Sequence, residues 1–336
     1  MSSLAQGAAG VPAPVAPGAR GGRRVRRSSR AREESRTGLL LITPTFVIVV
    51  AVVVLPVLWT VSLAFQRVRL LDLRDTGVLG DYTLANLADV LTSPGFLESL
   101  RTTLVYSVGG TACAIGIGLV AALALRRPFR GRGAVRAAML LPYVAPVVAA
   151  TFVWSTALSP QFGVVNHWGT ELLGWDEPIA FLSSRADTFS LLGWEITVPT
   201  ALLTVIAFEA WRSFPFAFLF LTARLQAVPE TLDEAARVDG ATPSQRFRHI
   251  LLPQLLPTIA VLSVLRFIWT YNNFDDIYLL TGGGAGTQVV AVRVFDYLTA
   301  RGDIGAAAAQ ALVLAVILAV AVTAYLRLFG RREEVA

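Results

Sequence analysis

Six long apolar segments, separated by shorter polar connections, set the pattern of this chain. A helix needs about 20 mainly apolar residues to cross a bilayer, and each segment reaches that length. The predicted spans are residues 38–65, 101–125, 137–158, 198–223, 256–280 and 304–328. The pattern therefore predicts an all-α integral membrane protein with six transmembrane helices, its membrane domain over residues 37–330 lying between two polar tails, 1–36 and 331–336.

The polar stretch 228–257 interrupts this pattern between the fourth and fifth spans, and it predicts a short helix-turn-helix. Pro229 suits the start of a helix, because the first position needs no backbone N–H. Gly240 suits its end, because glycine adopts the left-handed backbone conformation at little cost. A second helix is expected to begin at once, since Thr242 and Gln245 are spaced as a capping box.

The second helix of this stretch has one apolar stripe, formed by Phe247, Ile250 and Leu251. Pro253 and Pro257 are expected to end or kink the helix before the fifth span. Two short helices held at a fixed angle could transmit a movement of a soluble partner to the membrane spans. The plainer alternative is an ordinary amphipathic loop.

Composition narrows the function classes. Charged residues make up 15% of the 336 residues and hydrophobic residues 54%, whereas soluble domains average about 25% charged. All 29 basic residues are arginine, so a P-loop ATP site, which needs a lysine, is not expected. The single Cys113 excludes a disulfide within the chain, and the widely separated His167 and His249 predict no metal site.

Arginine placement predicts the orientation, since cytoplasmic loops carry an excess of basic residues. Most arginines lie in the tail 1–36, in the connection 126–136, in the polar stretch or after the last span, while acidic residues gather in the connections 66–100 and 159–197. Both termini and the polar stretch are therefore expected in the cytoplasm. The N-terminal tail is expected to be disordered, with attraction to anionic lipid left open and no nucleic-acid partner expected.

The polar stretch resembles the EAA signature of importer permeases of the ATP-binding-cassette class. The fixed positions of that signature are matched by Glu234, Ala235, Ala236, Gly240, Ile250, Leu252 and Pro253. Two further segments, 225–229 and 274–283, are similar to the carbohydrate branch, whose members are maltose- and glycerol-phosphate-type subunits. Two departures concern Gly284, where the branch often has proline, and Arg224, where glycine is common.

The resemblance implies a set of partners. A permease of this class pairs with a second permease subunit, most often as a heterodimer in this branch. A dimer of ATPase subunits, which binds ATP and Mg²⁺, clasps the signature helices, and an extracytoplasmic binding protein delivers the solute. The chain itself is then neither an enzyme nor a cofactor protein, and it lies in a bacterial plasma (inner) membrane.

Three charged residues fall inside the predicted spans: Glu209, Arg212 and Arg266. Charges at membrane depth are costly and usually face a cavity or a partner. Counting along the helices places Arg212 and Arg266 at similar depth and Glu209 slightly further out, so we expect Glu209 to neutralise one or both arginines. A structural role and a role in lining the solute path both stay open.

Polar and aromatic residues near the far end of the fifth span are candidates for the solute path. Amides, carboxylates and aromatic rings suit hydroxyl-rich ligands, because they offer donors, acceptors and a stacking face. The candidates are Asn272, Asn273, Tyr271, Asp275 and Trp211, with Trp269 nearby. For Asp275 and its neighbour Asp276 the alternative is that they meet only water.

The sequence thus predicts the permease subunit of an ATP-driven importer for a sugar or sugar-like solute, working by alternating access. One alternative is a permease for a polyol or a glycerol-phosphate-type solute. Another, from a different class, is a gradient-driven secondary transporter, in which Glu209 would be the proton-relay carboxylate. A membrane enzyme is disfavoured, because no nucleophile-base pair or metal cluster supports it.

Overall fold

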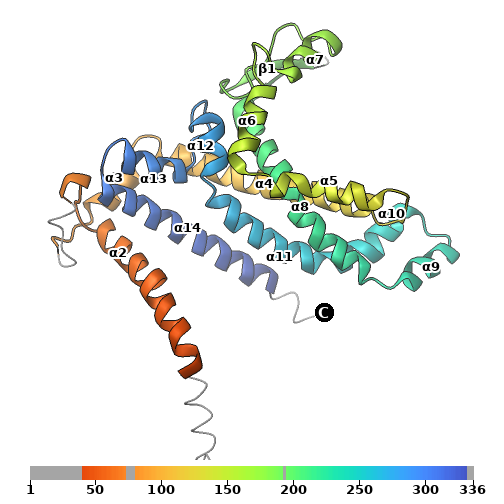
Figure 1. Cartoon of the computed structure of the whole chain (residues 1–336), viewed down its shortest axis with the longest axis horizontal. Coiled ribbons are helices and arrows are strands. Elements are labelled where there is room, and N and C mark those ends of the chain that lie inside the picture. The colour runs from red at the N-terminus through yellow and green to blue at the C-terminus, as the bar shows by residue number, and fades with distance from the viewer. Residues whose placement is uncertain (1–39, 73–79, 192–193, 331–336) are drawn as a thin grey trace, which may run out of the picture. The chain divides into compact units, whose positions relative to one another are not determined.

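A computed structural model describes residues 40–72, 80–191 and 194–330 (Figure 1). The two predicted tails, 1–36 and 331–336, lie outside these described residues. The chain divides into two compact units, residues 1–57 and 58–336.

The described part of the first unit, residues 40–57, is helical and apolar. It contains a π-helical turn, Val50–Val54, and helix α2 (Leu55–Ala64) begins directly after it. The resulting helix, Leu40–Ala64, has 25 residues and a mean hydropathy of 2.8, which is long and apolar enough to cross a membrane.

Three long helices form the frame of the second unit: α4 (Phe96–Ala124), α8 (Thr200–Gln226) and α14 (Ile304–Gly330). Helices α4 and α8 run side by side (Figure 1). Their backbones come close at Gly118, where an added Cβ would lie 2.8 Å from the Cβ of Ala217 and 2.9 Å from the backbone nitrogen of Phe218. A glycine on α4 therefore sets this packing distance.

The third predicted span, 137–158, is a bent pair of helices. Helices α5 (Arg132–Val144) and α6 (Val147–Ala157) meet at an angle of 97°. Ala145, between them, is extended with ψ 137°, as expected for a residue that precedes a proline. Pro146 thus breaks a run that apolar composition alone reads as one helix.

The fifth span begins earlier and ends sooner than the sequence predicts. Helix α10 (Pro243–Arg246), the π turn η3 (Phe247–Leu251) and α11 (Leu252–Tyr271) form one continuous helix. Of the two outcomes predicted for Pro253 and Pro257, an end or a kink, the end is wrong, because the helix continues through both prolines. In the π turn Leu252 N–H bonds to the Phe247 carbonyl, so Pro253 sits at the start of a new α-helical segment, where its missing N–H is tolerated.

Helix α11 ends at Tyr271, and a separate short helix follows, α12 (Asp275–Thr281). The side chain of Asn272 donates to the carbonyl of Ile268, and the side-chain oxygen of Asn273 accepts the N–H of Asp276. Such side-chain to backbone bonds compete with helix continuation. The two asparagines therefore divide the predicted span 256–280 into two helices.

The connections contain smaller elements: η2 (Leu70–Asp72), α3 (Ala85–Thr92), α7 (Val164–Leu172), α13 (Val290–Thr299) and an antiparallel hairpin of β1 (Asp187–Leu191) and β2 (Trp194–Val198). The buried Asn166 organises the loop around α7. Its amide nitrogen donates to the carbonyls of Leu158, Ser159 and Ile179, and its oxygen accepts the N–H of Ile179.

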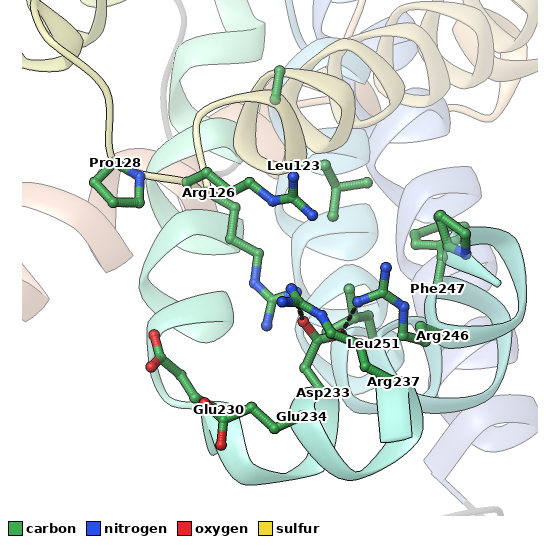
Figure 2. Close-up of a pocket in the computed structure, with 13 residues that line it drawn as sticks. Leu123, Arg126, Pro128, Glu230, Asp233, Glu234, Arg237, Arg246, Phe247 and Leu251 are labelled. Atoms are coloured by element: carbon green, nitrogen blue, oxygen red, sulfur yellow. Dashed lines mark hydrogen bonds and ion pairs between the residues drawn. The ribbon is translucent and has the colours of Figure 1, made fainter. Parts of the chain in front are cut away.

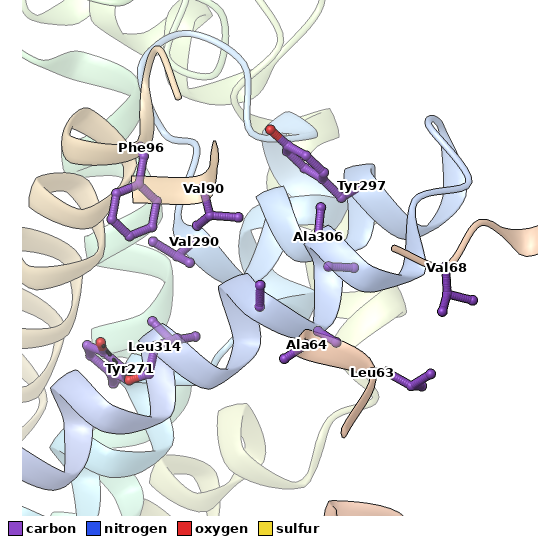
Figure 3. Packing of buried hydrophobic residues seen from close by; sticks show 13 residues of the cluster. Leu63, Ala64, Val68, Val90, Phe96, Tyr271, Val290, Tyr297, Ala306 and Leu314 are labelled. Carbon is purple, nitrogen blue, oxygen red and sulfur yellow. Dashed lines mark hydrogen bonds between the residues drawn. The ribbon is translucent and has the colours of Figure 1, made fainter. Parts of the chain in front are cut away.

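Helix α14 packs through small residues. Ala306 to Ala309 are all buried, in one cluster with Val90 of α3, Val290 of α13 and Tyr271 of α11 (Figure 3). Small side chains such as these allow neighbouring helices to approach closely.

By length and apolar composition, the described residues hold five helices able to cross a membrane, or six if α5 and α6 count as one span. The predicted helical membrane fold is confirmed. The hairpin is an addition that the apolar pattern did not predict.

Candidate coupling elbow and intramembrane charge cluster

The polar stretch, which we call the elbow (residues 228–257), contains the predicted pair of helices. Helix α9 spans Glu230–Val238, and α10 begins at Pro243. Between them Gly240 has φ +77°, the left-handed conformation predicted for it. Thr242 and Gln245 form the predicted capping box, with Gln245 N–H donating to Thr242 Oγ1 at 3.3 Å and Thr242 N–H to Gln245 Oε1 at 2.8 Å.

The residues that match the signature lie on both helices. Glu234 and Ala235 are exposed on α9, whereas Ala236 is buried. Ile250 and Leu252 are half-buried in the continuous helix and Pro253 is exposed. One side of α9 thus presents a carboxylate and a small side chain to the surroundings.

The inner side of α9 carries Asp233, a buried carboxylate that three arginines surround (Figure 2). Arg237 Nη2 donates to its Oδ2 at 2.9 Å and Arg246 Nη1 to its Oδ1 at 3.0 Å. Arg126, from the loop after α4, forms an ion pair at 3.9 Å. Glu230 and Glu234 point away from this cluster (Figure 2).

Burial alone would raise the pKa of the Asp233 carboxyl. The guanidinium groups of Arg246, Arg126 and Arg237 together outweigh burial and hold this pKa below its ordinary value. Asp233 is therefore charged at neutral pH. The carboxylate lies in a cleft of about 820 Å³ between the end of α4, α9 and α10.

The charged residues of the spans lie together. Glu209 of α8 is fully buried and forms an ion pair with Arg266 of α11. Thr270 and Ser213 donate hydroxyl hydrogens to Glu209 Oε1 at 2.9 and 3.1 Å, and Arg212 Nη2 lies 3.7 Å from Oε2. The structure thus brings Glu209 to both arginines.

A fourth charged residue, Asp276 of α12, completes this charge cluster. It is fully buried, accepts from Arg212 Nη2 at 3.2 Å and from Asn273 Nδ2 at 2.9 Å, and so does not meet only water. The cluster thus contains two arginines and two acidic side chains. Gly110 of α4 makes room, since an added Cβ would lie 3.0 Å from Cγ of Glu209.

The candidate solute-path residues have different surroundings. Asn272 and Asp275 are exposed, whereas Asn273 donates to Asp276 within the charge cluster. Tyr271 is buried and its hydroxyl donates to the carbonyl of Leu314, a placement that favours a packing role. Trp211 is half-buried against Trp154, with ring centroids 5.5 Å apart.

The structure also shows an aromatic group of which the sequence analysis identified only Trp269. Trp269 of α11 and Phe220 of α8 are both 47% exposed. Each packs against Phe216, with ring centroids 5.0 and 4.8 Å apart, and Tyr143 of α5 lies 6.1 Å from Phe216. The signal in the sequence is weak, because phenylalanines in a span are usually read as lipid-facing.

A family model described as "Binding-protein-dependent transport system inner membrane component" matches residues 114–334. The inner membrane ABC transporter permease protein YcjO of Escherichia coli is 32% identical over 85% of this chain and 92% of its own length. The trehalose/maltose transport system permease protein MalF of Thermococcus litoralis is 31% identical over 90% of this chain and 96% of its own.

The fold also has a counterpart among solved structures. A chain of a bacterial ABC transporter that imports the acidic polysaccharide alginate superposes with a TM-score of 0.75. The match covers 90% of this chain and 99% of the other, at 22% identity. This likeness concerns the fold.

Proposed function

This chain belongs to the family of binding-protein-dependent transport system inner membrane components, and from that premise we propose that it carries a sugar or sugar-like solute across the plasma membrane of a bacterium. The trehalose/maltose permease, similar over nearly its whole length, supports a sugar over other solutes. A polyol or glycerol-phosphate-type solute is the alternative.

The elbow is the observation that carries the proposal. Its nine-residue helix α9 keeps Glu234 and Ala235 open to a partner, and it leads through α10 into the continuous helix that ends at Tyr271. We assign this open side of α9 to a dimer of ATPase subunits that binds ATP and Mg²⁺. Since the chain has no lysine for a P-loop, the energy for transport comes from that partner.

The orientation follows from the arginines. The elbow cleft is lined by Arg126, Arg127, Arg237 and Arg246, and basic residues favour the cytoplasmic side. We place the elbow and both termini in the cytoplasm. The hairpin β1–β2 and α7 then face outside, where the binding protein would deliver solute.

The solute path that fits best runs beside the far half of α11. The exposed Asn272 and Asp275 and the half-buried Asn273 offer hydrogen bonds, and the aromatic group of Trp269, Phe216 and Phe220 offers stacking faces. A second permease subunit, in a heterodimer as this branch favours, would supply the opposite wall. Alternating access then means that the two subunits open this path to one side at a time.

A gradient-driven transporter is disfavoured by the charge cluster. A proton relay needs a carboxylate that can lose and regain its charge, whereas Glu209 accepts from Arg266, Thr270 and Ser213. These contacts hold the Glu209 carboxylate in place between α8 and α11. We therefore assign the charge cluster a structural role.

Reconstitution tests this function. The importer is purified through a tag on this chain, placed in proteoliposomes with its binding protein, and given radiolabelled trehalose, maltose or sn-glycerol-3-phosphate. We expect sugar uptake that needs hydrolysable ATP and persists after an ionophore collapses the proton gradient. Uptake that continues without ATP and stops with the gradient would overturn the proposal, and uptake of sn-glycerol-3-phosphate alone would favour the alternative solute.

A further inference from the structure

Helix α9 has little apolar packing to hold it in place. Of its nine residues only Asp233 and Ala236 are buried. Its two larger apolar side chains face outward, with Leu232 44% and Val238 87% exposed. Because burial of apolar surface contributes little here, polar contacts must set the position of this helix.

Those polar contacts converge on Asp233 and come from separate parts of the chain. Arg126 follows α4, and Arg246 lies on α10, beyond the Gly240 turn. Arg237 is on α9 itself, one turn after Asp233, and directs the carboxylate rather than tying it to another element. Asp233 therefore connects α9 to α10 and to the loop that directly follows α4.

Both connections lead to the charge cluster. The route through Arg126 enters α4, whose Gly110 lies against Glu209 and Thr270. The route through Arg246 enters the continuous helix Pro243–Tyr271, which carries Arg266. A displacement of α9 that moved both helices would thus act on the same buried contacts from two sides.

We propose that Asp233 is the positioning residue of the importer, which fixes α9 to α4 through Arg126 and to α10 and α11 through Arg246. This inference rests on the proposed function, in which α9 receives the movement of the ATPase subunits. The inference goes beyond that function, because it assigns the position of α9 to Asp233, the residue before Glu234, whereas Glu234 faces the partner.

Charge supports this assignment. One carboxylate stands among three guanidinium groups, so its removal leaves three cations that repel one another. The depressed pKa of Asp233 agrees with a carboxylate that stays ionised. The contact is therefore permanent at neutral pH and does not act as a pH switch.

The first test measures the position of α9 without solute or ATP. Backbone hydrogen exchange over residues 231–240 is compared in the assembled importer for the unchanged chain, Asp233→Asn and Arg127→Gln. We expect exchange in Asp233→Asn to rise about tenfold, because α9 loses its anchor. Arg127 is exposed and lines the same cleft, so its variant is the matched control and should leave exchange unchanged.

The second test measures coupling by a double-mutant cycle in proteoliposomes, as ATP hydrolysed per trehalose imported. Arg126→Gln and Asp233→Asn should each raise this ratio by about tenfold, and the double variant should be no worse than the poorer single one. Arg126→Gln leaves the Asp233 carboxylate with two arginines. This single variant therefore still tests the proposal if Asp233→Asn fails to assemble.

The two proposals fail in different ways. Unchanged exchange over α9 in Asp233→Asn, or effects that simply add in the double variant, would overturn the role of Asp233 and leave the importer function standing. A normal importer complex without ATP-driven sugar uptake would overturn the function, while the exchange measurement would still decide whether Asp233 anchors α9.

Discussion

A carboxylate buried among helices is tolerated only where cations and hydrogen-bond donors surround it. Glu209 meets this condition, with Arg266, Thr270 and Ser213 around its carboxylate. Asp276 meets it through Arg212 and Asn273. The four residues of the charge cluster therefore connect α8, α11 and α12.

The first residue-scale prediction concerns Glu209→Gln. The variant keeps the shape of the side chain and leaves Arg266 uncompensated, so we expect destabilisation of about 3–5 kcal/mol. The yield of assembled importer, measured by size-exclusion chromatography in detergent, should fall severalfold. The control is Asp275→Asn, which removes an exposed carboxylate close by and should assemble normally. Normal assembly of Glu209→Gln with lost uptake would instead place Glu209 in the solute path.

The second concerns Trp269→Ala. Loss of one stacking face should raise the KM for sugar uptake by about tenfold while assembly is kept, since aromatic contacts of this kind are worth on the order of 1 kcal/mol. Leu203→Ala, which shortens an exposed side chain on α8, should leave KM unchanged. An unchanged KM in Trp269→Ala would remove the aromatic group from the proposed path.

At the scale of elements, glycines decide how the helices meet. Gly118 lets α4 approach the backbone of α8, and Gly240 lets the chain turn between α9 and α10. At Gly118 a side chain would collide with α8, whereas at Gly240 a side chain would disfavour the left-handed backbone. Each position is therefore tested by a different substitution.

For the helix contact we expect Gly118→Ala to destabilise the protein by about 1–3 kcal/mol, because the added methyl meets backbone atoms of α8 that cannot move aside. Thermal unfolding of the purified protein measures the effect. Gly116→Ala on the same helix is the matched control, since an added Cβ there has no atom within 4 Å among the contacts of the described chain. Equal melting temperatures for both variants would contradict the packing derived from Gly118.

For the turn we expect Gly240→Val to uncouple ATP hydrolysis from uptake while the protein still inserts. Nothing crowds this position, so the effect comes from the left-handed backbone, which costs a side chain roughly 1–2 kcal/mol. Asparagine tolerates that conformation, and Gly240→Asn should therefore remain coupled. The ratio of ATP hydrolysed to sugar imported distinguishes the two, and equal ratios would show that the turn is not needed.

The sequence predicted elements whose causes are local. The capping box of Thr242 and Gln245 and the turn at Gly240 depend on neighbouring residues, and both formed as expected. Ala145-Pro146 also carried a local signal for a break, but the apolar run around it concealed the bend. The π turn before Pro253 had no recognisable pattern.

Contacts between distant segments were harder to foresee. Asp233 and Arg126 are 107 residues apart in the sequence, and the periodicity of a helix or strand does not predict a contact between them. For Asp276 the sequence left contact with water open as an alternative, whereas the break at Asn272 and Asn273 places it against Arg212. Tertiary packing, not local pattern, places these residues.

At the scale of the whole molecule, the chain combines long apolar helices with a polar elbow on which Glu234 and Ala235 are exposed. Asp233 faces inward, toward the helices, and Glu234 faces outward. In the proposed account these adjacent residues have two tasks: Asp233 holds α9 in position, and Glu234 faces the partner. This division is the reason for expecting energy to enter the membrane domain at the elbow.

The most direct test of that claim is the ratio of ATP hydrolysed to sugar imported by the reconstituted importer carrying Glu234→Arg. The exposed position lets the reversed charge be introduced without disturbing the core, so assembly should match that of the unchanged chain. We predict that ATP hydrolysis continues while ATP-driven uptake is lost. Uptake and hydrolysis that both match the unchanged importer would contradict the account and leave the elbow as an ordinary loop.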